Sequence, residues 1–218
     1  MPKLCPKLIL EGTRLCRKTD LAFALNEHPR IVGARKYRYH SPVVSAEWGV
    51  FDNTPWGRGM INYLPEQEAW AMAAYEGWMR LFELQPYSSW IVDRFHISTA
   101  SHQTGVHGRA PDFADLEARL KRQGFRLLLL HRSDESFVHA RAERLKVSGN
   151  PSQYDDLQPF IDEQARLREL CRASTLELLE VDISDDDVDA AADRIADWLE
   201  ASGGLTQPDG LERYALGG

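Results

Sequence analysis

Short apolar runs alternate along the chain with stretches whose apolar residues recur every three to four positions. The runs have the length of buried parallel strands, and the periodic stretches predict amphipathic helices. Strands are expected at Leu8–Glu11, Ile31–Tyr37, Ser88–Asp93, Phe125–His131 and Leu176–Ile183. Helices are expected at Thr19–Asn26, Pro65–Leu84, Phe113–Arg122, Ser133–Lys146, Tyr154–Arg172 and Asp185–Ala201.

Strands separated by helices favour a parallel sheet that is covered on both faces. The sequence therefore predicts an α/β fold, a three-layer α/β/α sandwich around a five-stranded parallel sheet. Residues 1–202 are expected to form a single domain, and residues 203–218 a loose C-terminal tail. An irregular insert rich in Pro, Gly and aromatic residues occupies about 38–64.

The long helix Pro65–Leu84 contains an apolar series at helical spacing. Its members are Trp70, Ala74, Trp78 and Leu81. We expect this series to face the core, with both tryptophans buried.

Charge and cysteine content narrow the range of partners. The 218 residues carry a net charge of −7, so stable binding to long DNA is not expected. Basic residues cluster at Arg14–Lys18 and Arg30–Arg38, which suits a small polyanion better. The 3 cysteines have no C-x-x-C spacing, and no run approaches the ~20 apolar residues of a membrane span. A cytoplasmic protein without disulfides, zinc or membrane partner is expected.

The first strand leads into the most informative segment, which has the spacing of the phosphate-binding loop G-x-x-x-x-G-K-[ST]. It reads Gly12-Thr13-Arg14-Leu15-Cys16-Arg17-Lys18-Thr19. In such a loop, backbone N–H groups bind phosphates, Lys18 reaches the β/γ-phosphates, and the Thr19 hydroxyl holds Mg²⁺. Arg17 stands in place of the second glycine. It is compatible with phosphate binding if its φ is negative, or it distorts the loop.

A second polar segment follows the third strand. Asp93 is placed to hold Mg²⁺ or to accept a substrate proton, and Arg94 offers a bidentate fork for a phosphate. Ser98 and Gln103 could hydrogen-bond a base edge. The alternative is a simple Asp93–Arg94 ion pair.

Together these segments resemble the thymidylate kinase-like branch of the P-loop nucleoside and nucleotide kinases. The likeness rests on Glu11-Gly12 at the start of the loop, on Asp93-Arg94-Phe95, and on Ser98 and Gln103. The order of strands and helices also agrees with that of the family over roughly residues 7–200. It implies ATP and Mg²⁺ as cofactors, with Lys18 on the donor phosphates and Thr19 at the metal. It also implies that Asp93 orients the acceptor near the metal, that Arg94 binds the acceptor, and that the enzyme forms a homodimer.

The resemblance further implies an arginine-bearing lid at about 137–153, in which Arg141 and Arg144 close over the donor phosphates. Arg14 stands where thymidylate kinases usually have an aspartate. It is close to the position at which some of them carry a catalytic arginine.

The region expected to line the acceptor pocket departs from thymidylate kinases, whose Arg-Glu-Pro-Gly segment is absent. Glu47 lies there, either as a base or hydroxyl-binding group or as a solvated loop carboxylate. The expected function is ATP-dependent phosphoryl transfer to a nucleotide, a nucleoside or a related small molecule. The alternatives are nucleotide binding without chemistry, as a sensor or partner protein, and a kinase for a modified DNA base or a natural product.

Overall fold

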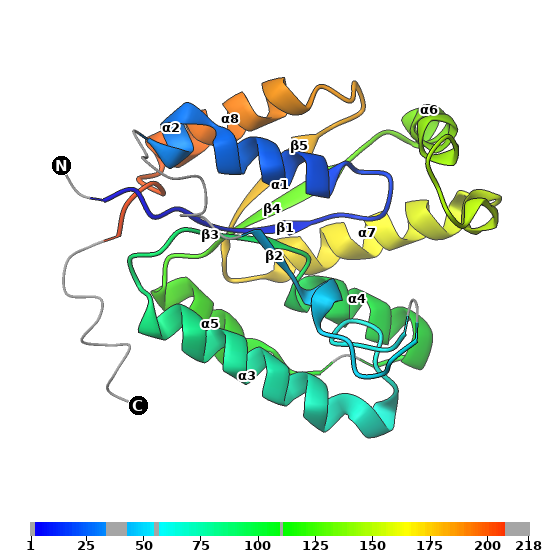
Figure 1. Ribbon diagram of the computed structural model, residues 1–218, viewed down its shortest axis with the longest axis horizontal. Helices are drawn as coiled ribbons and strands as arrows, with labels where there is room; N and C mark the ends of the chain where they lie inside the picture. Colours follow the sequence, from blue (N-terminus) through cyan, green and yellow to red (C-terminus); the bar gives the residue numbers. More distant parts are fainter. Residues whose placement is uncertain (1–2, 34–42, 55–56, 110, 208–218) are drawn as a thin grey trace.

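A five-stranded sheet lies at the centre of the protein, between two layers of helices (Figure 1). The computed structural model describes residues 3–33, 43–54, 57–109 and 111–207. All strand pairs are parallel, in the order β2-β3-β1-β4-β5. The strands are β1 (Lys7–Glu11), β2 (Val43–Ser45), β3 (Trp90–Asp93), β4 (Arg126–His131) and β5 (Glu177–Asp182). The predicted α/β fold with a five-stranded parallel sheet is confirmed.

The helices cover both faces because the central strands carry apolar side chains on both sides. Leu8 and Leu10 of β1 pack on one face, and Ile9 packs on the other. The first face is covered by α1 (Lys18–Glu27), α2 (Pro29–Val32) and α8 (Val188–Ala201) (Figure 1). The second is covered by α3 (Glu68–Leu84), α4 (His96–His107), α5 (Ala114–Arg122) and α7 (Gln158–Ala173).

Three short 3₁₀ helices and one further α-helix complete the described elements. They are η2 (Ala46–Trp48), η3 (Pro65–Gln67), η4 (Pro151–Tyr154) and α6 (Asp134–Leu145). In Figure 1, α6 and η4 project beyond the carboxyl ends of the strands, on the right. No helix within the described ranges is long and apolar enough to cross a membrane.

The predicted second strand, Ile31–Tyr37, is wrong where the structure can be compared with it. Ile31 and Val32 belong to α2, because Pro29 at the first helical position starts a turn rather than a strand. Residues 34–42 lie outside the described residues. The sheet's second strand is instead β2, inside the predicted irregular insert. Three residues are too few for a period of two to be recognised.

One helix was not predicted, and another begins later than predicted. Residues 96–107 form α4, which the sequence did not predict because few of its residues are apolar. The helix expected at Tyr154–Arg172 begins at Gln158, after η4.

The buried face of α3 is rotated by one residue from the predicted one. Trp70 is 60% exposed and Leu81 is 41% exposed, so the expectation of a buried Trp70 is wrong. The core is instead contacted by Ala71, Tyr75, Met79 and Phe82. Both series have helical spacing, and only the position of the sheet decides between them.

The ends of the described chain pack together. Cys5 N donates to Leu205 O at 2.8 Å, and Leu205 packs against the core. Of the expected tail, residues 208–218 lie outside the described residues. Cys5, Cys16 and Cys171 are buried free thiols.

Candidate functional site

The loop between β1 and α1 lies at the carboxyl ends of the strands, where parallel α/β sheets bind ligands. Gly12 has a φ of 154°, and a Cβ there would lie 2.7 Å from Leu130 O of β4. The backbone can pass this close to β4 only because residue 12 has no side chain. The loop is therefore packed directly against the neighbouring strand, and it leads into α1 at Lys18.

Lys18 and Thr19 begin α1, and each makes a hydrogen bond within the site. Lys18 is buried, and its Nζ donates to Thr13 O at 2.8 Å. Burial, with Arg94 nearby, lowers the pKa of Lys18. Thr19 Oγ1 donates to Asp93 Oδ2 at 2.8 Å, so the two predicted metal ligands are in direct contact.

The second oxygen of Asp93, Oδ1, is buried and has no partner within the described part of the chain. Mg²⁺ typically takes one or two protein oxygens and keeps waters and phosphate oxygens as its other ligands. Thr19 and Asp93 fit such a site. Within the described ranges, no group of three or more His, Cys, Asp or Glu residues is arranged to hold a metal ion.

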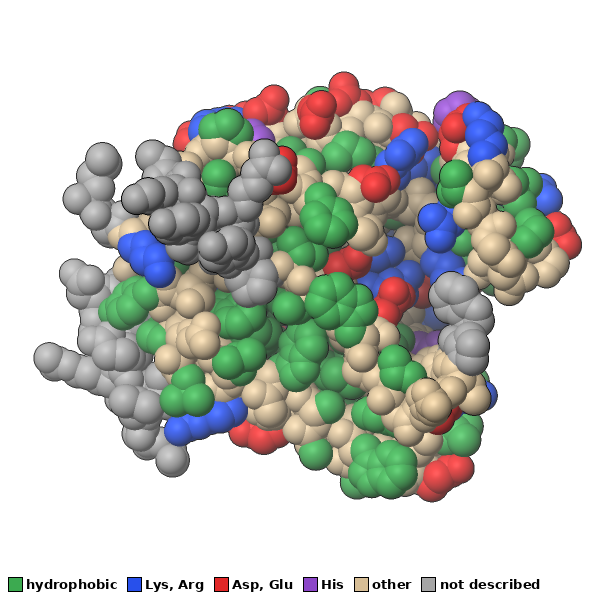
Figure 2. Space-filling view, in the orientation of Figure 1, with side chains coloured by type: hydrophobic (Ala, Val, Ile, Leu, Met, Phe, Trp, Pro, Cys, Tyr) green, Lys and Arg blue, Asp and Glu red, His purple; other side chains and the backbone are tan. Residues whose placement is uncertain are grey.

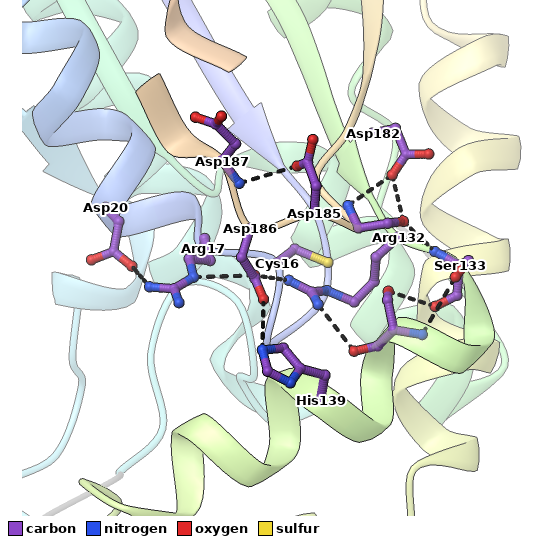
Figure 3. A network of polar contacts seen from close by, with 12 residues as sticks. Cys16, Arg17, Asp20, Arg132, Ser133, His139, Asp182, Asp185, Asp186 and Asp187 are labelled. Carbon is purple, nitrogen blue, oxygen red and sulfur yellow. Dashed lines mark hydrogen bonds and ion pairs between the residues drawn. The ribbon is translucent and has the colours of Figure 1, made fainter. Parts of the chain in front are cut away.

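Arg17 adopts the backbone conformation of the glycine that it replaces. Its φ of 52° and ψ of 26° lie in the left-handed region, so the negative φ under which the sequence analysis expected Arg17 to be tolerated is not found. Its guanidinium contacts acidic side chains outside the loop: Nε lies 3.1 Å from Asp186 Oδ1, and Nη1 lies 3.3 Å from Asp20 Oδ2 (Figure 3). The loop thus keeps a glycine-type turn, and the added side chain is tied to α1 and to the β5–α8 turn.

Asp186 is shared with a second arginine, which the sequence reading missed. Arg132 Nη2 lies 2.7 Å from Asp186 Oδ1, and the Arg132 side chain is fully buried (Figure 3). The backbone N–H of Arg132 donates to Gln164 Oε1 at 2.9 Å, and Gln164 Nε2 donates to Arg132 O at 2.8 Å. These contacts join the phosphate-loop region, the end of β4, α7 and the β5–α8 turn. The position of Arg132 directly after a strand was the only available sequence signal.

Arg94 lies between two carboxylates. Its Nε is 3.2 Å from Glu47 Oε1, and its Nη1 is 3.4 Å from Glu163 Oε1. Glu163 Oε2 also accepts a hydrogen bond from Thr13 Oγ1 of the phosphate loop. Asp93 and Arg94 are therefore engaged with different partners, and the alternative of a simple Asp93–Arg94 ion pair is wrong.

Glu163 was also missed, because nothing in its local sequence separates it from other helical glutamates. Burial raises its pKa, but Arg94, the Thr13 hydroxyl and Lys18 together hold that pKa below its usual value. Burial opposes the charged form of Arg94, yet Glu163 and Glu47 leave the pKa of Arg94 above its usual value. Arg94 and Glu163 therefore stabilise each other's charged forms.

The remaining predicted acceptor residues make internal contacts. Ser98 Oγ donates to Glu11 Oε2, and the Phe95 N–H donates to Glu11 Oε1 at 2.9 Å. Gln103 Nε2 donates to Ile61 O and to Tyr63 O, each at 3.1 Å. Ser98 thus positions the start of the phosphate loop, and Gln103 holds the insert. Their contact with a base edge stays a prediction.

Arg14 and the lid arginines meet at the α6–η4 projection. Arg14 donates to Gln153 Oε1, and Arg144 Nε donates to Tyr154 Oη at 3.1 Å. Arg141 Nη2 lies 3.7 Å from Asp155 Oδ1. Figure 2 shows a hollow between this projection and the body of the molecule, with basic side chains gathered in it and acidic ones beside them. The role of the three arginines in phosphoryl transfer stays a prediction.

Most of the chain superposes on a solved protein structure. YorR from Bacillus subtilis, solved in complex with phosphorylated GDP, matches with a TM-score of 0.62 and 16% identity, over 92% of this chain and 99% of that one. The chain shares the fold of that protein, an α/β fold around a five-stranded parallel sheet.

Thymidylate kinases are also found among the similar structures. The Candida albicans enzyme matches with a TM-score of 0.49 and 14% identity, over 93% of this chain and 94% of that one. The Ehrlichia chaffeensis enzyme matches with a TM-score of 0.45 and 11% identity, over 89% of this chain and 98% of that one. No family model and no curated protein sequence matches the chain. The comparisons therefore establish the α/β fold alone, and the residue roles rest on the site itself.

Proposed function

We propose that this protein is an ATP- and Mg²⁺-dependent phosphotransferase acting on a nucleotide, a nucleoside or a related small molecule. The contact of Thr19 Oγ1 with Asp93 Oδ2, beside the buried Lys18, carries the proposal. It brings the two sequence motifs, 74 positions apart, to one point at the carboxyl ends of β1 and β3. The P-loop kinase fold supports the same assignment.

Each group in the site has a role in in-line transfer of the γ-phosphoryl group, in which catalysis is mainly positioning and charge stabilisation. The backbone of residues 12–19 and the Lys18 ammonium would hold the donor phosphates. Thr19 and Asp93 would hold Mg²⁺, which neutralises phosphate charge when bound. Arg14, Arg141 and Arg144 would close over the donor from the lid, and Arg94 would face the acceptor.

Transfer of label from [γ-³²P]ATP to a panel of nucleosides and nucleoside monophosphates tests the proposal. Lys18→Ala should lower transfer by about a hundredfold or more, since it removes a charge that stabilises the transferring group. Lys121→Ala, an exposed lysine on α5, is the matched control and should be unaffected. Transfer that survives Lys18→Ala in a folded protein would contradict the assignment.

A nucleotide-binding protein without chemistry is the second candidate, because an arginine side chain stands at position 17, where the phosphate-loop pattern has a glycine. Calorimetry with ATP, with and without Mg²⁺, combined with the label assay, separates the two. Binding without transfer to any acceptor of the panel would support the sensor or partner role.

A further inference from the structure

The phosphate loop meets the β5–α8 turn through two residues whose backbones are left-handed. Arg17 has a φ of 52° and Asp186 a φ of 59°, and their side chains form an ion pair at 3.1 Å (Figure 3). This conformation strains residues other than glycine, and such strain clusters at active sites and ligand-binding segments. A glycine at position 17 would form the same turn without strain. The turn itself therefore does not require arginine, and the guanidinium is what distinguishes this loop.

The guanidinium of Arg17 lies at the outer edge of its network. The Arg17 side chain is 38% exposed, and Asp20, whose Oδ2 lies 3.3 Å from Arg17 Nη1, is 60% exposed. Ion pairs between exposed groups contribute little to stability, because water and salt compete for both charges. Arg17 can therefore leave these carboxylates for a more highly charged anion at low cost.

Asp186 keeps a counter-charge when Arg17 leaves. Arg132 Nη2 lies 2.7 Å from Asp186 Oδ1, the same oxygen that accepts from Arg17, and the Arg132 side chain is fully buried. A second contact holds this guanidinium, from Arg132 Nη1 to Ser136 O at 3.2 Å. A charge removed from water is costly when it is left unpaired. Release of Arg17 leaves Asp186 paired, whereas release of Arg132 would leave a buried cation alone.

A phosphate bound by the loop would lie beside Arg17. This residue immediately precedes α1, at a helix N-terminus, where free N–H groups and the helix dipole attract anions. Lys18, the next residue, is the cation expected on the donor phosphates. A guanidinium can bind a phosphate through two parallel charge-assisted hydrogen bonds, whereas each of its described carboxylate partners receives one bond from Arg17. A donor phosphate is therefore the stronger competitor for this side chain.

We infer that Arg17 is a donor-binding residue, whose guanidinium exchanges Asp186 for a phosphate of the nucleoside triphosphate when the nucleotide binds. The inference rests on the nucleotide binding of the proposed function and deepens it by adding a ligand of the donor phosphates. Asp186 stays with Arg132, and Arg17 joins Lys18 as a second cation on the donor. The arginine that replaces the glycine of the loop pattern thus raises donor affinity and is not a defect of the loop.

Calorimetric titration of the full chain with MgATP tests the inference. Arg17→Gly restores the loop pattern, yet it should weaken binding about tenfold, because the charged hydrogen bonds to phosphate outweigh the exposed ion pairs that Arg17 gives up. Arg17→Lys keeps the charge without the planar fork, so it should weaken binding only about threefold. Arg122→Ala, at the exposed arginine that ends α5, also removes one positive charge and should bind MgATP as the wild type does.

A double-mutant cycle tests the competition between carboxylate and phosphate. Asp20→Asn removes one carboxylate that holds Arg17, so MgATP should bind about two- to threefold more tightly. In the Arg17→Gly background the same substitution should have little effect, because no guanidinium is left to release. Glu169→Gln, at an exposed glutamate of α7, removes the same charge and should leave the affinity unchanged in both backgrounds. Inorganic tripolyphosphate in place of ATP should give the same order of variants, because the exchange involves phosphate.

A spectroscopic readout follows the exchange itself. The Nε–H resonance of Arg17 in a proton–nitrogen NMR spectrum, assigned by its loss in Arg17→Lys, should shift when MgATP is added. Circular dichroism checks that each variant is folded. Binding of MgATP by folded Arg17→Gly that is as tight as that of the wild type, or an Arg17 resonance that does not move, would overturn the inference.

The same measurements separate this inference from the proposed function. The expected order of MgATP affinities, without transfer of label to any acceptor, would support the role of Arg17 and contradict the phosphotransferase. Transfer of label in both the wild type and Arg17→Gly, with equal MgATP affinities, would support the phosphotransferase and overturn the role of Arg17. A wild type that does not bind MgATP would overturn both.

Discussion

The Arg17 Nε lies 3.1 Å from Asp186 Oδ1, and this ion pair joins the phosphate-binding loop to the turn between β5 and α8. Arg17 holds the left-handed backbone that a glycine would adopt at little cost, and for other residues that conformation costs roughly 1–2 kcal/mol. Asp186 also pairs with the buried Arg132 (Figure 3). The unusual residue in the loop is thus anchored by its own side chain.

Three substitutions at two members of this network, Asp186 and Arg17, should differ in their effect on stability. Asp186→Asn should be the most destabilising, by roughly 3 kcal/mol, because it leaves the buried Arg132 without its counter-charge. Arg17→Ala keeps the strained backbone and loses the ion pair with Asp186, so it should lower the free energy of unfolding by about 1–2 kcal/mol. Arg17→Gly also loses the ion pair but relieves the strain, so its free energy of unfolding should stay within about 1 kcal/mol of that of the wild type. Urea denaturation measures all three, with the exposed Asp189→Asn as control. A different order would mean that the ion pair does not anchor the loop.

Glycine at position 12 is required by the close approach of β4. Gly12→Ala would place a methyl group 2.7 Å from Leu130 O, so we expect a loss of about 2 kcal/mol or more and a severe loss of ATP binding. Gly77→Ala is the matched control. It lies in α3 with no atom within 4 Å of the added Cβ, so it should stabilise the protein by about 0.5–1 kcal/mol. Thermal melts and ATP titrations measure the stability and the ATP affinity of both variants. Equal effects of Gly12→Ala and Gly77→Ala would show that the approach of β4 does not require glycine at position 12.

The Thr19–Asp93 pair should make ATP binding depend on magnesium. Removing either ligand, by Thr19→Val or Asp93→Asn, should abolish most of the gain in ATP affinity that Mg²⁺ gives the wild type, because few other protein oxygens are available to the ion. Calorimetry at fixed ATP with and without Mg²⁺ measures this gain. Thr104→Val, on the exposed side of α4, should retain it in full. If both site variants kept the Mg²⁺-dependent gain in ATP affinity, Thr19 and Asp93 would be excluded as metal ligands.

Glu117 should contribute to acid stability. Burial raises its pKa, but His96, whose Nε2 lies 3.0 Å from Glu117 Oε1, and the Thr175 N–H lower it to about 2. An ordinary glutamate titrates at 4.5. The unfolded chain therefore takes up the proton first as pH falls, and up to about 3 kcal/mol of stability, present above pH 4.5, is lost toward pH 2.

Urea denaturation between pH 7 and pH 2 measures this loss. Glu117→Gln should lower stability at pH 7 and flatten the fall below pH 4.5. Glu169→Gln should leave the slope unchanged. A slope in Glu117→Gln equal to that of wild type would show that another group carries the acid transition.

Much of the fold follows from local patterns. The leucine run of β4 and the alternation of strands with helices predicted a parallel sheet, because a strand that is apolar on both sides must be covered on both sides. The sequence patterns could not predict β2 or decide which face of α3 is buried. A strand of three residues has no measurable period, and an apolar helix offers two equivalent series, of which only packing selects one.

The phosphate loop and the Asp93-Arg94 segment were visible in the sequence because their residue types and spacing are set by local backbone geometry. Their convergence, and the arrival of Glu163, Arg132 and Asp186 around them, depended on how strands and helices pack. Single glutamates, arginines and aspartates have no local signature, since their environment is created by segments far away in the chain. The sequence alone therefore indicated where phosphate is expected to bind. The tertiary contacts decided that Arg17 is anchored to Asp186 and that Arg94 lies between two carboxylates, because charge balance in a buried site is set by its three-dimensional neighbours.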